Sequence, residues 1–160
     1  MNAQDRIKAQ KLNNEGVSLI GSNPDKAIDL FEKAMQLCSI VPEYPNNMGV
    51  VKLNQKKFIE ALEYFQKAID IDQNYFHAFY NMGVCYQALS ENLKAVDYYL
   101  RAMKLKPNSP ELIFNMALVY SRLGDKENAI QYYKLFVRIA PISLAKPIED
   151  AKKRVEELLK

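Results

Sequence analysis

The stretch Phe79–Leu89, FYNMGVCYQAL, contains the tripeptide that decides how this chain folds. Asn81-Met82-Gly83 has a counterpart 34 residues earlier, Asn47-Met48-Gly49, and another 34 residues later, Asn115-Met116-Ala117. A repeat of this length is typical of arrays built from small helical units. The sequence therefore predicts several stacked copies of one supersecondary unit.

A second series of landmarks has the same period and lies in the other half of each unit. Alanines recur 34 residues apart, each followed by an aliphatic residue: Ala27, Ala61, Ala95 and Ala129. In the segment 61–71, ALEYFQKAIDI, apolar residues are spaced three and four apart, as on one face of a helix. Asn23 before Pro24 and Ser109 before Pro110 are typical helix starts. Each unit is predicted to be a helix hairpin, which must stack on its neighbours to bury its apolar face.

These landmarks together resemble the tetratricopeptide repeat family. The chain has that family's small residue after Asn-Met, the aromatic residue three positions later (Tyr86, Tyr120), the glycine at the hairpin (Gly124) and the closing proline (Pro107, Pro141). The resemblance implies an all-α fold, a right-handed superhelical solenoid of stacked antiparallel helix hairpins. It also implies that the first helices of the hairpins line a concave groove.

The repeat landmarks divide the chain into four repeats, which occupy 1–143, and a capping helix. The repeats are expected at about 8–41, 42–75, 76–109 and 110–143, and the C-terminal capping helix at 144–160. The first repeat is degenerate, because its turn is one residue shorter than the next. The inner face of the capping helix is expected to comprise Ile148, Ala151, Val155 and Leu158 or Leu159. Phe136, where a small residue is expected, should pack against this helix.

Composition excludes several functional classes. The net charge is only +3 and the basic residues alternate with acidic ones, so no nucleic-acid partner is expected. The chain has no apolar run long enough to span a membrane, and its polar first residues lack the core of a signal peptide. No membrane partner and a cytoplasmic location are therefore expected. Cys38 and Cys85 fall within helical patterns and are expected to be reduced core residues.

The recurring asparagines form what we call the amide row: Asn14, Asn47, Asn81 and Asn115. Asparagine is a mediocre helix former, about 0.6 kcal/mol worse than alanine, so its recurrence at one helical phase needs a reason. A primary amide can pair with both the N–H and the C=O of a peptide backbone. Asparagine rows in superhelices such as those of the O-GlcNAc transferase family hold extended peptides, and the resemblance implies a shorter version here.

The predicted groove consists of the amide row and its neighbours on the first helices. Its residues are Asn14, Asn47, Asn81, Asn115, Tyr80, Phe114, Val50, Val84, Leu118 and His77. Two alternatives stay open: the asparagines can bridge to the next helix, and Tyr80 and Phe114 can pack between repeats. Glu43 and Glu111 stand where a clamp for a peptide's C-terminal carboxylate needs basic residues, which disfavours such a clamp. Met48, Met82 and Met116 are expected in the core.

The leading hypothesis is a non-catalytic adaptor that binds an extended or amphipathic peptide segment of a partner protein. An alternative is a self-associating scaffold, a homo-oligomer whose groove is filled by its own N-terminal helix or by a neighbouring copy. A third possibility is the recognition arm of a larger enzyme. The sequence has no nucleophile–base pair, phosphate loop or metal-ligand cluster, so no enzyme activity, cofactor or metal is expected of this chain.

Overall fold

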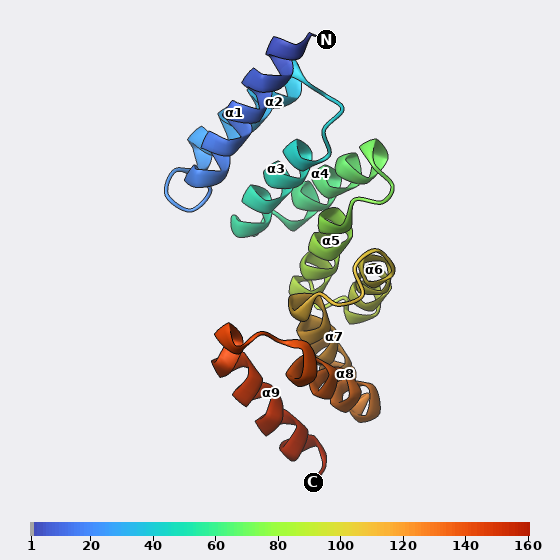
Figure 1. Cartoon of the computed structure of the whole chain (residues 1–160). Helices are drawn as coiled ribbons and strands as arrows, with labels where there is room; N and C mark the ends of the chain where they lie inside the picture. Colours follow the sequence, from blue (N-terminus) through green and yellow to red (C-terminus); the bar gives the residue numbers. More distant parts are fainter. Residues whose placement is uncertain (1) are drawn as a thin grey trace. The chain divides into compact units, whose positions relative to one another are not determined.

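The computed structural model describes residues 2–160, and every regular element within them is a helix (Figure 1). The elements are α1 Ala3–Leu19, α2 Pro24–Leu37, α3 Glu43–Asn54, α4 Phe58–Ile71, α5 Phe76–Ala88, α6 Asn92–Leu105, α7 Pro110–Arg122, α8 Lys126–Ile139, the 3-10 helix η1 Ile142–Leu144, and α9 Ala145–Leu158. The predicted all-α class is confirmed.

The helices form two compact units whose boundary falls inside α5. The first unit ends at Asn81 and the second begins at Met82. In the first unit α1 packs on α2 and α3 on α4, and in the second α7 packs on α8, which also contacts α9. Figure 1 shows these pairs as antiparallel neighbours, so the predicted hairpin arrangement is confirmed.

Local sequence signals set the helix starts. The Asn23 side chain accepts a hydrogen bond from the Lys26 backbone N–H at 3.2 Å, with Pro24 at the first helical position. Ser109 caps α7 in the same way ahead of Pro110. Both predicted caps are confirmed, because a side-chain oxygen satisfies an N–H that the first helical turn leaves without a partner.

In three hairpins a ring of the second helix lies against the glycine of the first helix. A Cβ atom added to Gly16 would lie 2.7 Å from the Phe31 ring, and one added to Gly49 would lie 2.5 Å from the Phe65 ring. In the second unit, a Cβ on Gly83 would lie 2.3 Å from the ring of Tyr99. The repeated glycine is therefore explained by packing, because the ring occupies the space of its absent side chain.

The capping helix covers the end of the second unit. Ala151 is fully buried in one cluster with Tyr133 and Phe136, and the side chains packed against that cluster include Ile148, Val155 and Leu158. Leu159 is largely exposed. The predicted inner face of α9 and its contact with Phe136 are thus confirmed, with Leu158 rather than Leu159 on the buried side.

Three methionines and both cysteines occupy the core as predicted. Met48, Met82 and Met116 are buried, and so are the reduced thiols of Cys38 and Cys85. Burial raises the pKa of the Cys85 thiol to about 11, because the thiolate loses its hydration in an apolar surrounding. A reactive thiolate is therefore suppressed at this position.

We expect Cys85 to resist thiol reagents in the folded protein. With a pKa of about 11, only about one thiol in a thousand is ionised near pH 8, and the sulfur is buried. In a Cys38→Ala protein, the release of thionitrobenzoate from Ellman's reagent should be very slow without denaturant. The same protein in guanidinium chloride should react promptly. A fast native reaction would mean that α5 opens far more readily than its packing implies.

Candidate peptide-binding site

Three members of the amide row lie in the first unit. The Nδ2 of Asn47 on α3 donates to the Oδ1 of Asn13 on α1 at 2.8 Å. The Nδ2 of Asn81 on α5 donates to the Oδ1 of Asn46 on α3 at 2.9 Å. Asn14 is exposed and accepts a hydrogen bond from Gln10 of its own helix at 3.0 Å. Asn47 and Asn81 therefore link each first helix to the one before it.

The amide acceptors Asn13 and Asn46 are not among the predicted site residues. They are 0% and 5% exposed, so the bonds to Asn47 and Asn81 satisfy polar groups that lie away from water. The sequence contains a signal for them, because Asn13-Asn14 and Asn46-Asn47 are adjacent pairs at the same place in two repeats. The first asparagine of each pair is buried, whereas Asn14 is exposed and Asn47 is partly exposed.

Glu43 fixes the direction of the first amide link. Its Oε1 accepts a hydrogen bond from the Nδ2 of Asn13 at 2.7 Å. An ionised carboxylate only accepts, so Asn13 must turn its Nδ2 toward Glu43 and its Oδ1 toward Asn47. Asn47 then presents its own Nδ2 inward, and no described residue donates to its Oδ1.

The same polarity holds for Asn81, whose Nδ2 is bound to Asn46 and whose Oδ1 receives no hydrogen bond from any described residue. Both Asn47 and Asn81 are partly exposed. In both residues an N–H of the amide is used in a hydrogen bond to a neighbouring helix. The Oδ1 of each residue is left able to accept a further hydrogen bond. Chemically, such a surface can accept hydrogen bonds from N–H groups.

Aromatic residues precede Asn81 along α5 in the first unit. Tyr80 is partly exposed and stacks on Phe76, with ring centroids 6.1 Å apart. His77 is exposed and its ring lies edge-on to Phe76 at 5.2 Å. Nearby, burial and then the charge of Glu43 raise the pKa of Tyr75 to about 12, so this phenol is neutral and can donate. Val50 on α3 is partly exposed.

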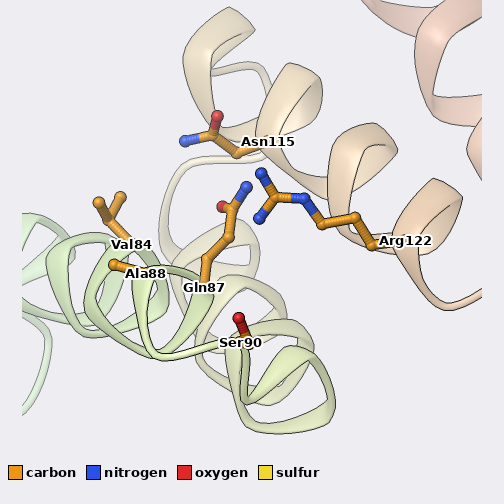
Figure 2. Close-up of a pocket in the computed structure, with 6 residues that line it drawn as sticks. All are labelled: Val84, Gln87, Ala88, Ser90, Asn115 and Arg122. Atoms are coloured by element: carbon orange, nitrogen blue, oxygen red, sulfur yellow. The ribbon is translucent and has the colours of Figure 1, made fainter.

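In the second unit, Val84 and Asn115 line a cavity of about 500 Å³ between α5 and α7 (Figure 2). Its other lining residues are Gln87, Ala88, Ser90 and Arg122, and we call it the α5–α7 cavity. None of these four is a predicted site residue. Gln87 and Arg122 each follow a predicted residue, Val84 or Leu118, by about one helical turn, which is the signal that could have identified them.

Phe114 and Leu118, the other predicted residues of this unit, pack toward the capping cluster. The ring of Phe114 lies 5.0 Å from that of Phe136 and 5.8 Å from that of Tyr133, measured between centroids. Leu118 contacts the same cluster. Both side chains are partly exposed, so they contribute to packing and to the surface together.

Neither a metal-ligand cluster nor a membrane-spanning helix is found among the described residues. Within residues 2–160, no three histidine, cysteine or acidic side chains gather closely enough to hold a metal ion. None of the helices over the same residues combines the length and apolar character needed to cross a bilayer.

Comparison with known families identifies the repeat. Two family models, both described as tetratricopeptide repeat, match residues 44–108 and 110–143. The chain belongs to the tetratricopeptide repeat family. The hairpins α3–α4, α5–α6 and α7–α8 of this tetratricopeptide protein lie essentially within the matched residues. The segment 8–41 lies outside them, and its place as a degenerate first repeat stays a prediction.

Solved structures share this tetratricopeptide fold. A crystal structure of MamA is similar at 23% identity with a TM-score of 0.73, covering 81% of this chain and 77% of the other. PilF of Pseudomonas aeruginosa is 21% identical with a TM-score of 0.75, covering 94% and 76%. The first tetratricopeptide domain of Spaghetti (RPAP3), bound to the HSP90 peptide SRMEEVD, is 26% identical with a TM-score of 0.69, covering 74% and 95%. Among curated proteins, none matches this sequence significantly.

Proposed function

We propose that this tetratricopeptide protein is a non-catalytic adaptor that binds an extended or amphipathic peptide segment of a partner protein along its first helices. The observation that carries the proposal is that Asn47 and Asn81 are partly exposed, and that each uses an amide N–H internally while no described residue donates to its Oδ1. Support comes from the similar domain of Spaghetti, whose structure contains a bound peptide.

The chemistry of the proposed contact follows from the polarity of the amides. Each Oδ1 accepts a backbone N–H of the peptide, a group that an extended segment leaves unpaired. Neighbouring first helices lie about 9–10 Å apart and an extended chain advances about 3.3 Å per residue, so one asparagine meets about every third peptide residue. Asn14 and Asn115 extend this row in the proposal.

Aliphatic and aromatic side chains supply the remaining part of the proposed contact. Val50, Tyr80 and His77 flank the amides in the first unit, and Val84, Phe114 and Leu118 do so in the second. An amphipathic peptide would place its apolar side chains on these residues while its backbone is held by the amides. Partly exposed aromatic residues such as Tyr80 are favoured at protein interfaces.

The test uses a peptide selected on the protein itself. A phage-displayed library of random peptides is panned on the wild-type protein, and the best synthetic peptide is titrated calorimetrically. We expect Asn47→Ala combined with Asn81→Ala to weaken its binding by about 1–3 kcal/mol, since each lost hydrogen bond contributes about 0.5–1.5 kcal/mol. Gln66→Ala on the exposed face of α4 is the matched control and should bind normally.

Both asparagines also satisfy buried partners, so stability is measured on the same samples. Each alanine leaves the Oδ1 of Asn13 or Asn46 without its donor, at a cost of about 1–3 kcal/mol in unfolding free energy. If the double variant is unfolded, the same binding and stability measurements are made on the single Asn81→Ala variant. Unchanged affinity in a folded variant would show that the amide row only joins helices.

Self-association is the second candidate, and it is favoured by strongly exposed aliphatic side chains. Leu93 on α6 is 76% exposed and Ile142 on η1 is 91% exposed. Light scattering over a concentration series separates the two functions. A particle whose mass stays that of one 18.4 kDa chain at every concentration excludes the scaffold.

A further inference from the structure

The α5–α7 cavity contains an arginine with no acidic partner. Arg122 is exposed at the end of α7, and none of the ion pairs formed by the described residues includes it. No aspartate or glutamate lines the cavity. The acidic residues next to the lining residues in sequence have other partners, since Glu91 binds Lys94 and Asp125 binds Asn128 at the start of α8.

Gln87 adds a second donor, and its orientation is set by a buried tyrosine. The hydroxyl of Tyr99, which is fully buried, donates to the Oε1 of Gln87 at 2.7 Å. A buried tyrosine hydroxyl requires such a partner. Because its oxygen is occupied by Tyr99, Gln87 turns its Nε2 the other way.

The two donors converge in the cavity. Figure 2 shows the side chains of Gln87 and Arg122 reaching toward one another from α5 and α7, with Asn115 beside them and Val84 and Ala88 on the α5 side. The Nε2 of Gln87 and the guanidinium of Arg122 both carry only N–H groups, so neither can satisfy the other. The hydroxyl of Ser90 can contribute a third donor. N–H donors that converge where no carboxylate lines the cavity can hold an oxyanion.

Charge on the second unit agrees with this polarity. Residues 82–160 contain 13 lysines and arginines against 9 acidic residues, whereas residues 1–81 contain 9 against 10. A net positive unit attracts an acidic ligand before contact and steers it toward an unpaired guanidinium. An arginine is also suited to grip a carboxylate with two parallel hydrogen bonds.

We propose that the α5–α7 cavity binds the side-chain carboxylate of an aspartate or glutamate within the partner's peptide segment. Arg122 forms the ion pair, the Nε2 of Gln87 donates a second hydrogen bond, and Tyr99 is a positioning residue that acts through Gln87. This inference rests on the proposed peptide-binding function and specifies the peptide's chemistry. It differs from a clamp for a C-terminal carboxylate, because the ligand group is internal to the segment.

The first test is nuclear magnetic resonance with a small probe, which does not depend on any partner. N-acetyl-glutamate α-amide, with one side-chain carboxylate, is titrated into the isotope-labelled full chain. We expect the side-chain resonances of Gln87 Nε2 and Arg122 Nε to shift and to saturate. N-acetyl-glutamine α-amide, the neutral isostere, should shift neither. Equal responses to the two probes, or none to either, would overturn the proposal.

Variants assign the effect to the named residues. Arg122→Gln should weaken binding of the glutamate probe about five- to tenfold, a loss reduced by solvent at this exposed side chain. Arg138→Gln, which removes an equal charge from exposed Arg138 on α8, should leave it unchanged. Tyr99→Phe keeps the ring and should weaken binding by releasing Gln87. If Arg122→Gln and Arg138→Gln weaken probe binding equally, the probe responds only to the net charge of the unit, and the proposed site is overturned.

Two further experiments distinguish this inference from a phosphate site and from the proposed peptide-binding function. The first is a titration with inorganic phosphate. If phosphate shifts the same resonances at a lower concentration than the glutamate probe does, the cavity is a phosphate site and the carboxylate proposal is overturned. The second experiment uses peptides selected on the wild-type protein. Their affinity for the wild type should fall when an internal aspartate or glutamate is replaced by asparagine or glutamine. Amidation of the peptide's C-terminus should leave the affinity unchanged. If such peptides bind wild type and Arg122→Gln equally, this inference fails while the proposed function stands. If no peptide binds but the probe does, the proposed function fails instead.

Discussion

Ala151→Asp should lower the free energy of unfolding of the second unit by about 3–5 kcal/mol, the cost of an uncompensated buried charge. Ala151 is the fully buried contact of α9, and it lies among Tyr133, Phe136 and Ile113. A carboxylate there either stays charged in an apolar cluster or forces α9 away from α8. Denaturant unfolding followed by circular dichroism measures the loss.

The control for this experiment is the same substitution six residues earlier on α9. Ala145 is the exposed first residue of α9, so Ala145→Asp places the charge in water at the helix N-terminus, where a negative charge is slightly favourable. Its effect should stay within about 0.5 kcal/mol. Similar effects of Ala145→Asp and Ala151→Asp would mean that the capping helix does not stabilise the array.

Phe65→Ala is the second large effect, with an expected loss of about 3–5 kcal/mol in the free energy of unfolding. The Phe65 ring is fully buried and fills the space beside Gly49. Its removal leaves a cavity between α3 and α4 that the hairpin cannot close without moving a helix. Ile59→Ala, at a 65% exposed position on the same helix, should change stability by only about 0.5 kcal/mol.

A double-mutant cycle tests the reason for this loss. Gly49→Ala alone should destabilise the protein, because its Cβ would lie 2.5 Å from the Phe65 ring. In the Phe65→Ala background the same change meets no ring and should stabilise by up to about 1 kcal/mol, the helix preference of alanine over glycine. A coupling near zero would show that ring and glycine do not share the space.

The sequence predicted the hairpins because their determinants are local and repeated. Asn23 and Ser109 cap helices through backbone groups three residues away, and the ring opposite Gly49 lies within the same hairpin. Such interactions depend on helical phase, which the order of residues displays directly. The inner face of α9 followed for the same reason, from apolar spacing along one helix.

The site was harder to predict because its contacts join different first helices. Sequence placed Asn47 and Asn81 at one phase but left open whether they meet a ligand or a neighbour. That choice depends on which atoms come within about 3 Å across helices some 34 residues apart. Asn13, Asn46 and Glu43 were visible in the sequence only as polar neighbours of the row. Their hydrogen bonds show which atom of each amide is used.

The order of residues alone determined the repeat, its family, the small-residue positions and the capped helix ends, since these follow from periodicity and from interactions within one hairpin. Only the tertiary structure decided the direction of each amide and the meeting of Gln87 with Arg122. The physical reason is that hydrogen bonding is short-ranged and directional. A side chain's remaining donors and acceptors are known only once its buried neighbours have taken theirs.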